Sequence, residues 1–396
     1  MFKSFRVGSI ADIPIKLDIT LLLILPVLAF LIGSGMGEAV EAFEQIGAAF
    51  ESPELLVAGW TPWLLGFVAA VGLFVCVLLH ELGHAAVARH YDYGIASITL
   101  WLLGGVARPE KQPEQWNHEF WIAIGGPVVS VALGIGCYLV YGFAGAEPVQ
   151  SVLGVLTADS LRFLFGYLAL LNIVLAAFNM LPAFPLDGGR VMRALLGRTR
   201  PFTEATKTAV AVGKFFAILF GIFGLLMFNP FLVAIAFFVY IAAAAEGRQT
   251  VLEAAFRGVR VADVMTPANE VRTVETTATL DAILDRMFEE RHTGYPVVEG
   301  GKLVGIVTLA DIRNVHPEKR SETRVADVMS EDLEAVSPDT EAMDAMRQLA
   351  QHSVGRLVVT DEFGNLAGLL TRSDLVTAMN VVQEKRLSRG EEAAPR

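Results

Sequence analysis

The sequence predicts an α-helical polytopic membrane protein, with about six transmembrane helices and a short β-rich segment at the membrane edge, joined to an α/β cytoplasmic half. Composition is the first observation: 54% of the 396 residues are hydrophobic and the mean hydropathy is +0.51, more apolar than a typical soluble protein. The second is that the long apolar runs end near residue 248. The third is charge, because residues 249–396 hold 25 Asp/Glu and 17 Lys/Arg, against 17 and 14 before them.

A helix needs about 20 mostly apolar residues to cross a bilayer, and six segments approach or meet this requirement. They are Ile19–Met36, Trp63–Ala86, Phe120–Phe143, Leu161–Leu181, Thr208–Phe228 and Phe231–Ala245. Short loops rich in Lys and Arg stay in the cytoplasm. Basic residues precede the first segment and follow the second, fourth and sixth, whereas residues 37–61 hold five Glu and no Lys or Arg.

With six spans, all these basic loops fall on one side of the membrane. The most basic of them follows the fourth span and contains Arg190, Arg193, Arg198, Arg200 and Lys207. We therefore expect a multi-pass cell-membrane protein whose two termini and C-terminal half are cytoplasmic.

Composition also excludes several classes. The chain has no basic run or patch, so we expect no nucleic-acid partner. Its two cysteines, Cys76 and Cys137, lie in apolar runs, which is typical of small buried side chains. Two cysteines are too few for a disulfide framework or a cysteine-rich zinc site.

The second predicted span ends in the motif His80-Glu81-Leu82-Gly83-His84. Residues i and i+4 share one face of a helix, so His80 and His84 can reach one metal ion through imidazole nitrogens. Zinc favours such ligands and keeps a position open in catalytic sites. Glu81 is placed to take a proton from water beside the metal. A purely structural role is disfavoured, because ionisable groups are expensive within a span.

Two histidines leave a zinc site incomplete, and the end of the fourth span offers a third ligand. There Pro182 and Pro185 remove backbone donors and break the helix. Irregular backbone at membrane depth is tolerated where it lines a cavity or is buried in protein. We expect the break to turn Asp187 into the bundle at the depth of His80. The alternative is a plain turn, since Asp-Gly-Gly is common in turns.

Together, HELGH and NMLPAFPLDGGR resemble the motifs of the site-2 protease family of intramembrane metalloproteases, HExxH and NxxPxxxLDG. The resemblance covers about residues 1–248. It implies one Zn²⁺ per chain, bound by His80, His84 and Asp187, with Glu81 as the general base. It also implies that Asn179 holds the substrate backbone or steadies the oxyanion.

Three further features of the sequence bear on the same predicted domain. Residues 94–109 are β-rich and broken at Gly104-Gly105, and the resemblance implies strands that receive the substrate as an added strand; a re-entrant packing loop is the alternative. Gly125-Gly126 is similar to the family's small-residue packing site, where we expect close helix contact and no chemistry. Asn172 lies about two turns before Asn179, and either supports the site or bonds a neighbouring helix.

The C-terminal half contains a repeat. VADVM at 261–265 recurs at 325–329, and GIVTLADI at 305–312 recurs as GLLTRSDL at 368–375. Each unit predicts a strand, an amphipathic helix, two strands and a helix, and the pair resembles tandem CBS domains. The predicted divisions are a transmembrane metalloprotease domain at 1–248, a linker at 249–258, CBS domains at 259–320 and 321–382, and a disordered tail at 383–396.

The CBS resemblance implies ATP or another adenine nucleotide as a ligand. The family's ribose-binding pattern, Thr/Ser-x-x-Asp, is matched by Thr308 with Asp311 and by Thr371 with Asp374. A carboxylate can accept bonds from ribose hydroxyls, and a helix start favours phosphate. The alternative is that both threonines cap helices, and the sequence leaves open which site is used. CBS pairs often dimerise, so a homodimer is a further expectation.

The sequence thus predicts regulated zinc-dependent hydrolysis of a membrane-spanning protein within the lipid bilayer, modulated by an adenine nucleotide. A CBS-regulated transporter or channel is one alternative, but it requires polar residues spread through many spans. Here they concentrate at residues 80–84 and 179–187. A catalytically silent scaffold is another, and the intact Glu81 argues against it because metal binding does not need that residue.

Overall fold

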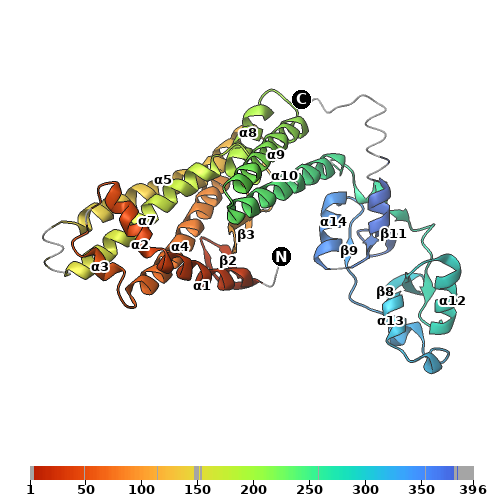
Figure 1. Cartoon of the computed structure of the whole chain (residues 1–396). Helices are drawn as coiled ribbons and strands as arrows, with labels where there is room; N and C mark the ends of the chain where they lie inside the picture. Colours follow the sequence, from red (N-terminus) through yellow and green to blue (C-terminus); the bar gives the residue numbers. More distant parts are fainter. Residues whose placement is uncertain are drawn as a thin grey trace. The chain divides into compact units, whose positions relative to one another are not determined.

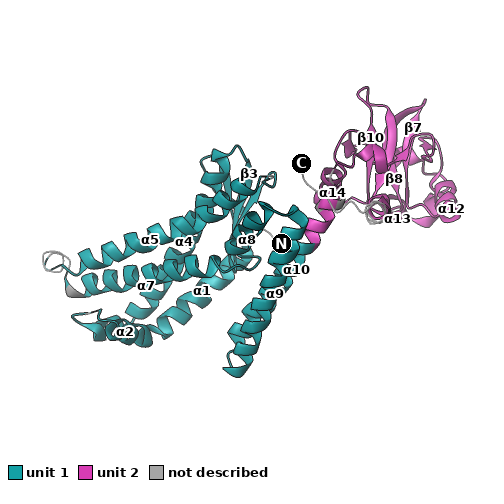
Figure 2. Cartoon of the chain, turned by 90° about the horizontal axis from the view of Figure 1, so that it is seen from above, with its two compact units in different colours: residues 1–247 teal, residues 248–396 magenta. Residues whose placement is uncertain are grey.

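The protein is described here by a computed structural model that covers residues 4–48, 50–113, 115–146, 151, 154–256, 258–352, 354–378 and 381. The chain divides into two units, Met1–Gly247 and Arg248–Arg396 (Figures 1 and 2). The predicted disordered tail at 383–396 lies outside the described residues.

Long apolar helices build most of the N-terminal unit (Figure 1). Within the described part of the chain, five helices are long and apolar enough to cross a membrane, and up to six if a bent pair counts as one span. The five are α4 (Thr61–His90), α5 (Trp116–Ala144), α7 (Val155–Asn179), α9 (Phe202–Leu226) and α10 (Pro230–Phe256). A polytopic helical membrane protein is therefore confirmed as the fold class of this unit.

The first predicted span is the bent pair. It consists of α1 (Ile19–Ser34) and α2 (Met36–Gln45), which meet at an angle of 56°. At 1.5 Å per residue α1 is about 24 Å long, shorter than a hydrocarbon core of about 30 Å. The short helix α3 (Pro53–Leu56) follows α2. Helix α10 runs past the last residue of this unit: residues 249–256 of the predicted linker continue it as helix, in keeping with the good helix formers Gln, Leu, Glu and Ala in that stretch.

A four-stranded sheet packs against α4. Its order is β1-β2-β3-β4, with β2 parallel to β3 and the other pairs antiparallel. The strands are β1 (Ser4–Ile10), β2 (Ile13–Asp18), β3 (Ile95–Trp101) and β4 (Gly104–Pro109). Ile13, Ile15 and Ile98 form one buried cluster with Ala85 of α4. The predicted β-rich segment is confirmed as β3 and β4, and β4 is an edge strand; the β1–β2 hairpin was not predicted.

Glycines allow α4 and α5 to approach at backbone contact. A Cβ added to Gly83 would lie 2.6 Å from the carbonyl oxygen of Gly125, and one added to Gly125 would lie 2.8 Å from that of Gly83. Atoms cannot approach so closely without displacing the backbone, so a larger residue at either position would separate the helices. The expected close packing at Gly125 is confirmed.

The break after α7 is a tight loop folded over the start of α8 (Asp187–Gly197). A Cβ on Gly188 would overlap the carbonyl oxygen of Leu181, and one on Gly189 would lie 2.6 Å from the backbone nitrogen of Phe184. Two glycines after Asp187 are therefore required for the loop to lie against its own helix. The segment that was predicted to break does so, and a helix begins at the aspartate.

The C-terminal unit contains two small sheets with helices, as the repeat predicts. One sheet has the order β6-β7-β8 and the other β5-β11-β10-β9. The strands are β5 (Thr266–Pro267), β6 (Val274–Glu275), β7 (Gly294–Glu299), β8 (Lys302–Thr308), β9 (Ala335–Val336), β10 (Arg356–Thr360) and β11 (Leu366–Thr371). The helices are α11 (Val261–Val264), α12 (Leu280–Glu290), α13 (Leu309–Arg313) and α14 (Ala342–Gln351), with 3-10 turns at Pro317–Lys319 and Val325–Asp327 and a further helix at 372–378.

The two repeats exchange their leading segments. Strand β5, which begins the first repeat, pairs with β11 of the second. In return, Ser330 near the start of the second repeat pairs with Ile306 of β8 in the first. The cores follow the same pattern, because Val261 is buried with the second repeat and Val325 with the first. Each sheet is therefore completed by the other half of the pair.

Candidate metal centre

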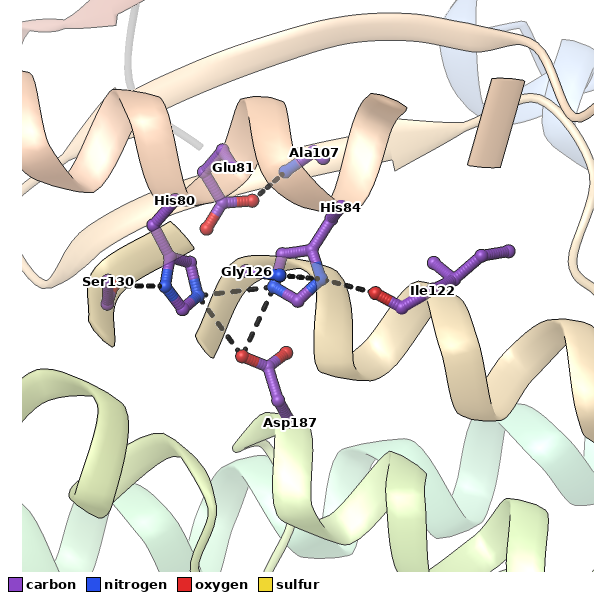
Figure 3. Close-up of polar contacts among 8 residues, drawn as sticks. All are labelled: His80, Glu81, His84, Ala107, Ile122, Gly126, Ser130 and Asp187. Carbon is purple, nitrogen blue, oxygen red and sulfur yellow. Dashed lines mark hydrogen bonds and ion pairs between the residues drawn. The ribbon is translucent and has the colours of Figure 1, made fainter. Parts of the chain in front are cut away.

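Three buried side chains from two helices converge in the N-terminal unit (Figure 3). His80 and His84 lie one turn apart on α4, and Asp187 is the first residue of α8. Both histidine Nε2 atoms lie 3.1 Å from Asp187 Oδ2 and 3.1 Å from each other. The three residues are 3%, 5% and 9% exposed, so solvent does not separate their polar atoms.

This spacing fits a zinc ion. Ligand atoms at about 2.0–2.1 Å from a tetrahedral zinc lie about 3.3 Å from one another, close to the 3.1 Å observed here. Imidazole nitrogens and a carboxylate oxygen are also ligand types that zinc accepts. Within the described residues these three form a group that could hold a metal ion, with ligand atoms within 4.8 Å of one another.

Hydrogen bonds at the opposite ring nitrogens aim the imidazoles. His84 Nδ1 lies 2.7 Å from the carbonyl oxygen of Ile122. A carbonyl only accepts, so Nδ1 carries the hydrogen and Nε2 keeps a lone pair. A longer contact of 3.3 Å from the Gly126 amide would need the other tautomer, and we favour the shorter one. His80 Nδ1 is 2.8 Å from the buried Ser130 Oγ. The Nε2 lone pair of His84 then faces the Asp187 carboxylate, an arrangement that a cation stabilises.

Gly126 of α5 lies directly against the two imidazoles. An added Cβ would lie 2.5 Å from His80 Nε2 and would overlap His84 Nε2. The expected close helix contact is confirmed for Gly126 too, and its missing side chain leaves room beside the candidate ligand atoms. Ser130, Gly126 and the Ile122 carbonyl were not predicted as parts of the site.

Glu81 of α4 lies on the same side of the helix as the two imidazoles, and one of its carboxylate oxygens points to Ala107 (Figure 3). Its Oε2 accepts a hydrogen bond of 3.0 Å from the backbone amide of Ala107 in β4. Gly105 of the same strand lies against it, since an added Cβ would overlap Glu81 Cγ and lie 3.0 Å from Cδ. The edge strand therefore holds the carboxylate in place, one residue from a candidate metal ligand.

The two asparagines of α7 differ in their surroundings. Asn179 is the last residue of the helix and is half-buried, and its side chain has no hydrogen-bond partner within the described ranges. Asn172 is fully buried and donates to the carbonyl of Leu168, 2.8 Å away in its own helix, while its Oδ1 has no partner in the part of the chain described. Of the two alternatives for Asn172, the bond to a neighbouring helix is therefore not formed within the described residues, and support of the site stays a prediction.

In the C-terminal unit, the predicted ribose-binding residues form two equivalent capping boxes. Asp311 Oδ2 accepts from the backbone nitrogen and hydroxyl of Thr308, at 2.8 and 2.7 Å. Asp374 Oδ2 accepts from Thr371 in the same way, at 2.8 and 2.8 Å. The helix-capping alternative is thus confirmed for both motifs, and nucleotide binding by the same residues stays a prediction.

Replacing Gly126 with alanine tests whether the space beside the imidazoles is essential. We expect Gly126→Ala to weaken zinc binding by about 100-fold or more, because the new methyl group occupies the space that the ligand atoms face. Zinc affinity is measured by competition with a metal chelator. Gly136→Ala on the same helix is the control, because an added Cβ there meets nothing within 4 Å. Equal zinc affinity in both variants would contradict the assignment.

Known proteins are similar to this chain over nearly its whole length. The model of Peptidase family M50 matches residues 68–155 and 143–220, and the CBS domain model matches residues 261–318 and 325–381. Zinc metalloprotease MJ0392 of Methanocaldococcus jannaschii is 35% identical over 385 residues, which cover 97% of this chain and 98% of that protein. Rip3 of Mycobacterium tuberculosis is 34% identical over 335 residues, or 81% and 82% of the two chains. The chain belongs to the site-2 protease family of zinc metalloproteases, peptidase family M50, and carries a C-terminal pair of CBS domains.

Proposed function

We propose that this chain cuts a membrane-spanning protein at a zinc ion held by His80, His84 and Asp187. The observation that carries the proposal is the convergence of three buried ligand atoms at zinc spacing, from helices long and apolar enough to lie in a bilayer. Exposed apolar side chains on α9 and α10, such as Leu226 and Phe237, support contact with lipid. A transporter would need polar groups along a path through many spans, and this arrangement does not support one.

The residues around the metal site have different roles in the proposed reaction. A zinc ion in this site would supply a Lewis acid that polarises the scissile carbonyl and lowers the pKa of the attacking water. Glu81 takes the proton from that water and passes it to the leaving amine. Asn179, whose amide has no partner within the described residues, binds the substrate backbone or the developing oxyanion. The Ile122 carbonyl and Ser130 keep both imidazoles aimed at the metal.

The edge strand β4 offers a docking surface for the substrate. A transmembrane helix satisfies its own backbone groups, so it must unwind before a peptide bond can reach the metal. An unwound segment can then pair with a free sheet edge, and β4 occupies that position beside Glu81. One strand, β4, would therefore both hold the general base Glu81 through a hydrogen bond and pair with the backbone of the substrate.

Charge and the CBS repeat support the remaining parts of the proposal. The basic loops favour a multi-pass protein of the cell membrane with both termini and the CBS pair in the cytoplasm. The CBS pair binds an adenine nucleotide and modulates cleavage, and two chains associate through it as a homodimer. The two Thr-x-x-Asp motifs support the ligand, because each carboxylate stands at a helix start, where ribose and phosphate can both be bound.

Cleavage of a panel of single-span proteins in detergent tests the reaction. We expect zinc-dependent cleavage by the wild-type protein and a loss of about 10²–10⁴-fold in Glu81→Gln, because the amide cannot accept the proton. Glu44→Gln, on the exposed surface of α2, is the matched control. Full activity of Glu81→Gln with zinc bound would contradict the role of Glu81.

Gly105→Ala tests the support that β4 gives to Glu81. We expect the new methyl group to displace the carboxylate and lower kcat by about 100-fold, while zinc affinity stays at the wild-type value. The same substitution at Gly8 of β1 is the control, since its added Cβ meets nothing within 4 Å. An unchanged kcat would show that Glu81 does not depend on the strand.

Nucleotide binding is tested by calorimetry with ATP on the full chain. We expect Asp311→Ala or Asp374→Ala to weaken ATP binding by about 10- to 100-fold, the loss of charge-assisted bonds to ribose. Asp327→Ala is the matched control, because Asp327 also caps a helical turn through a backbone nitrogen and lies outside the Thr-x-x-Asp motifs. Wild-type affinity in both motif variants would rule out these sites.

A further inference from the structure

A buried ion cluster lies on the helix that begins at Asp187. Arg193 of α8 donates from Nε to Glu119 of α5 at 2.7 Å, and from a terminal nitrogen to Glu246 of α10 at 2.8 Å. The three side chains are 4%, 2% and 29% exposed. One guanidinium thus joins three helices in an apolar interior, with two carboxylates around a single cation.

Two aromatic rings complete the surroundings of this guanidinium. Its central carbon lies 4.9 Å from the ring centre of Phe184 and 4.7 Å from that of Phe202. Phe184 belongs to the loop just before Asp187 and is itself buried. Arg193 therefore contacts the chain on the N-terminal side of Asp187 and anchors the helix on its C-terminal side.

Glu119, the partner of Arg193, lies on the helix that orients His84. Glu119 stands three residues before Ile122 on α5, and the Ile122 carbonyl accepts the hydrogen bond from His84 Nδ1. The pair of Arg193 with Glu119 thus ties the helix of Asp187 to the helix that orients His84. A planar guanidinium fork fixes distance and direction together, so the pair sets how α8 is rotated against α5.

Packing alone does not require such a cluster. Buried charges are expensive, and apolar side chains of similar size usually stabilise a fold at least as well. The best-attested use of a buried ion pair is to fix one register among several. In this protein the ion pair would fix the rotation of α8 about its axis. That rotation decides where Asp187 points, because Asp187 is the first residue of the helix.

We propose that Arg193 is a positioning residue for zinc: paired with Glu119, it holds Asp187 Oδ2 beside the two imidazoles, and Glu246 steadies the guanidinium from α10. Residues that orient metal ligands typically change metal affinity by about 10- to 100-fold when replaced. Glu246 is more exposed than Glu119, so its contribution is the smaller of the two.

The test measures zinc affinity of the full-length protein in detergent by competition with a chelator. We expect Arg193→Lys and Glu119→Gln to bind zinc about 10- to 100-fold more weakly, and Glu246→Gln to lose less. Arg198→Lys is the matched control, because Arg198 directly follows α8 and stacks on Trp116 with no ion pair to the residues described. Saturating zinc should restore most of the cleavage rate of Arg193→Lys, since its catalytic groups are intact.

A merely structural role predicts a different result. Wild-type zinc affinity in Arg193→Lys and Glu119→Gln, with only a lower melting temperature, would overturn the proposal. If Arg193→Lys does not fold, Glu119→Gln decides alone, because it keeps the size of the side chain and removes one charge. Zinc affinity is read without any substrate, so this test is independent of whether the chain cuts the proteins tried.

Discussion

The structure depends on keeping three polar ligand atoms together inside an apolar bundle. An imidazole nitrogen and a carboxylate oxygen 3.1 Å apart need a proton or a metal cation between them, and membrane interiors offer little water to compensate. The helices must therefore come close enough for the ligands to meet. Gly83 and Gly125 permit that approach, and Gly126 leaves the space in front of the imidazoles. These positions are therefore glycine, because a larger side chain would separate the helices at Gly83 or Gly125 and would fill the space beside the imidazoles at Gly126.

Local patterns predicted the parts of the site that lie within a few residues of one another. His80 and His84 follow from helical spacing, and the break before Asp187 follows from two prolines. The repeat predicted both α/β units of the C-terminal half. The β1–β2 hairpin was missed although Ile13, Ile15 and Leu17 alternate with Pro14 and Lys16, close to the pattern of a half-buried strand. Its parallel pairing with β3 joins segments about 80 residues apart, and no local pattern encodes such a contact.

Supporting groups were harder to predict than ligands. The Ile122 carbonyl is a backbone atom, so its role leaves no trace in the choice of side chain. Arg193 was counted among the basic residues of a cytoplasmic loop, yet its side chain is only 4% exposed and is paired with Glu119 and Glu246. Loop charge and buried charge look alike in a sequence, and only the tertiary partners distinguish them. The other basic residues of that loop, Arg190, Arg198, Arg200 and Lys207, are the ones that favour a cytoplasmic position.

The exchange of leading segments between the CBS repeats makes the pair a single folding unit. Strand β5 belongs to the first repeat in sequence but to the second sheet in space, and Ser330 does the reverse. A stop codon between the repeats would therefore remove the Ser330 partner of β8 and the β11 partner of β5 together. A chain that ended between the repeats would keep the β6-β7-β8 sheet but would lose the β11 partner of β5, and an unpaired strand is prone to aggregate. The first repeat therefore needs the second to complete the pairing seen here.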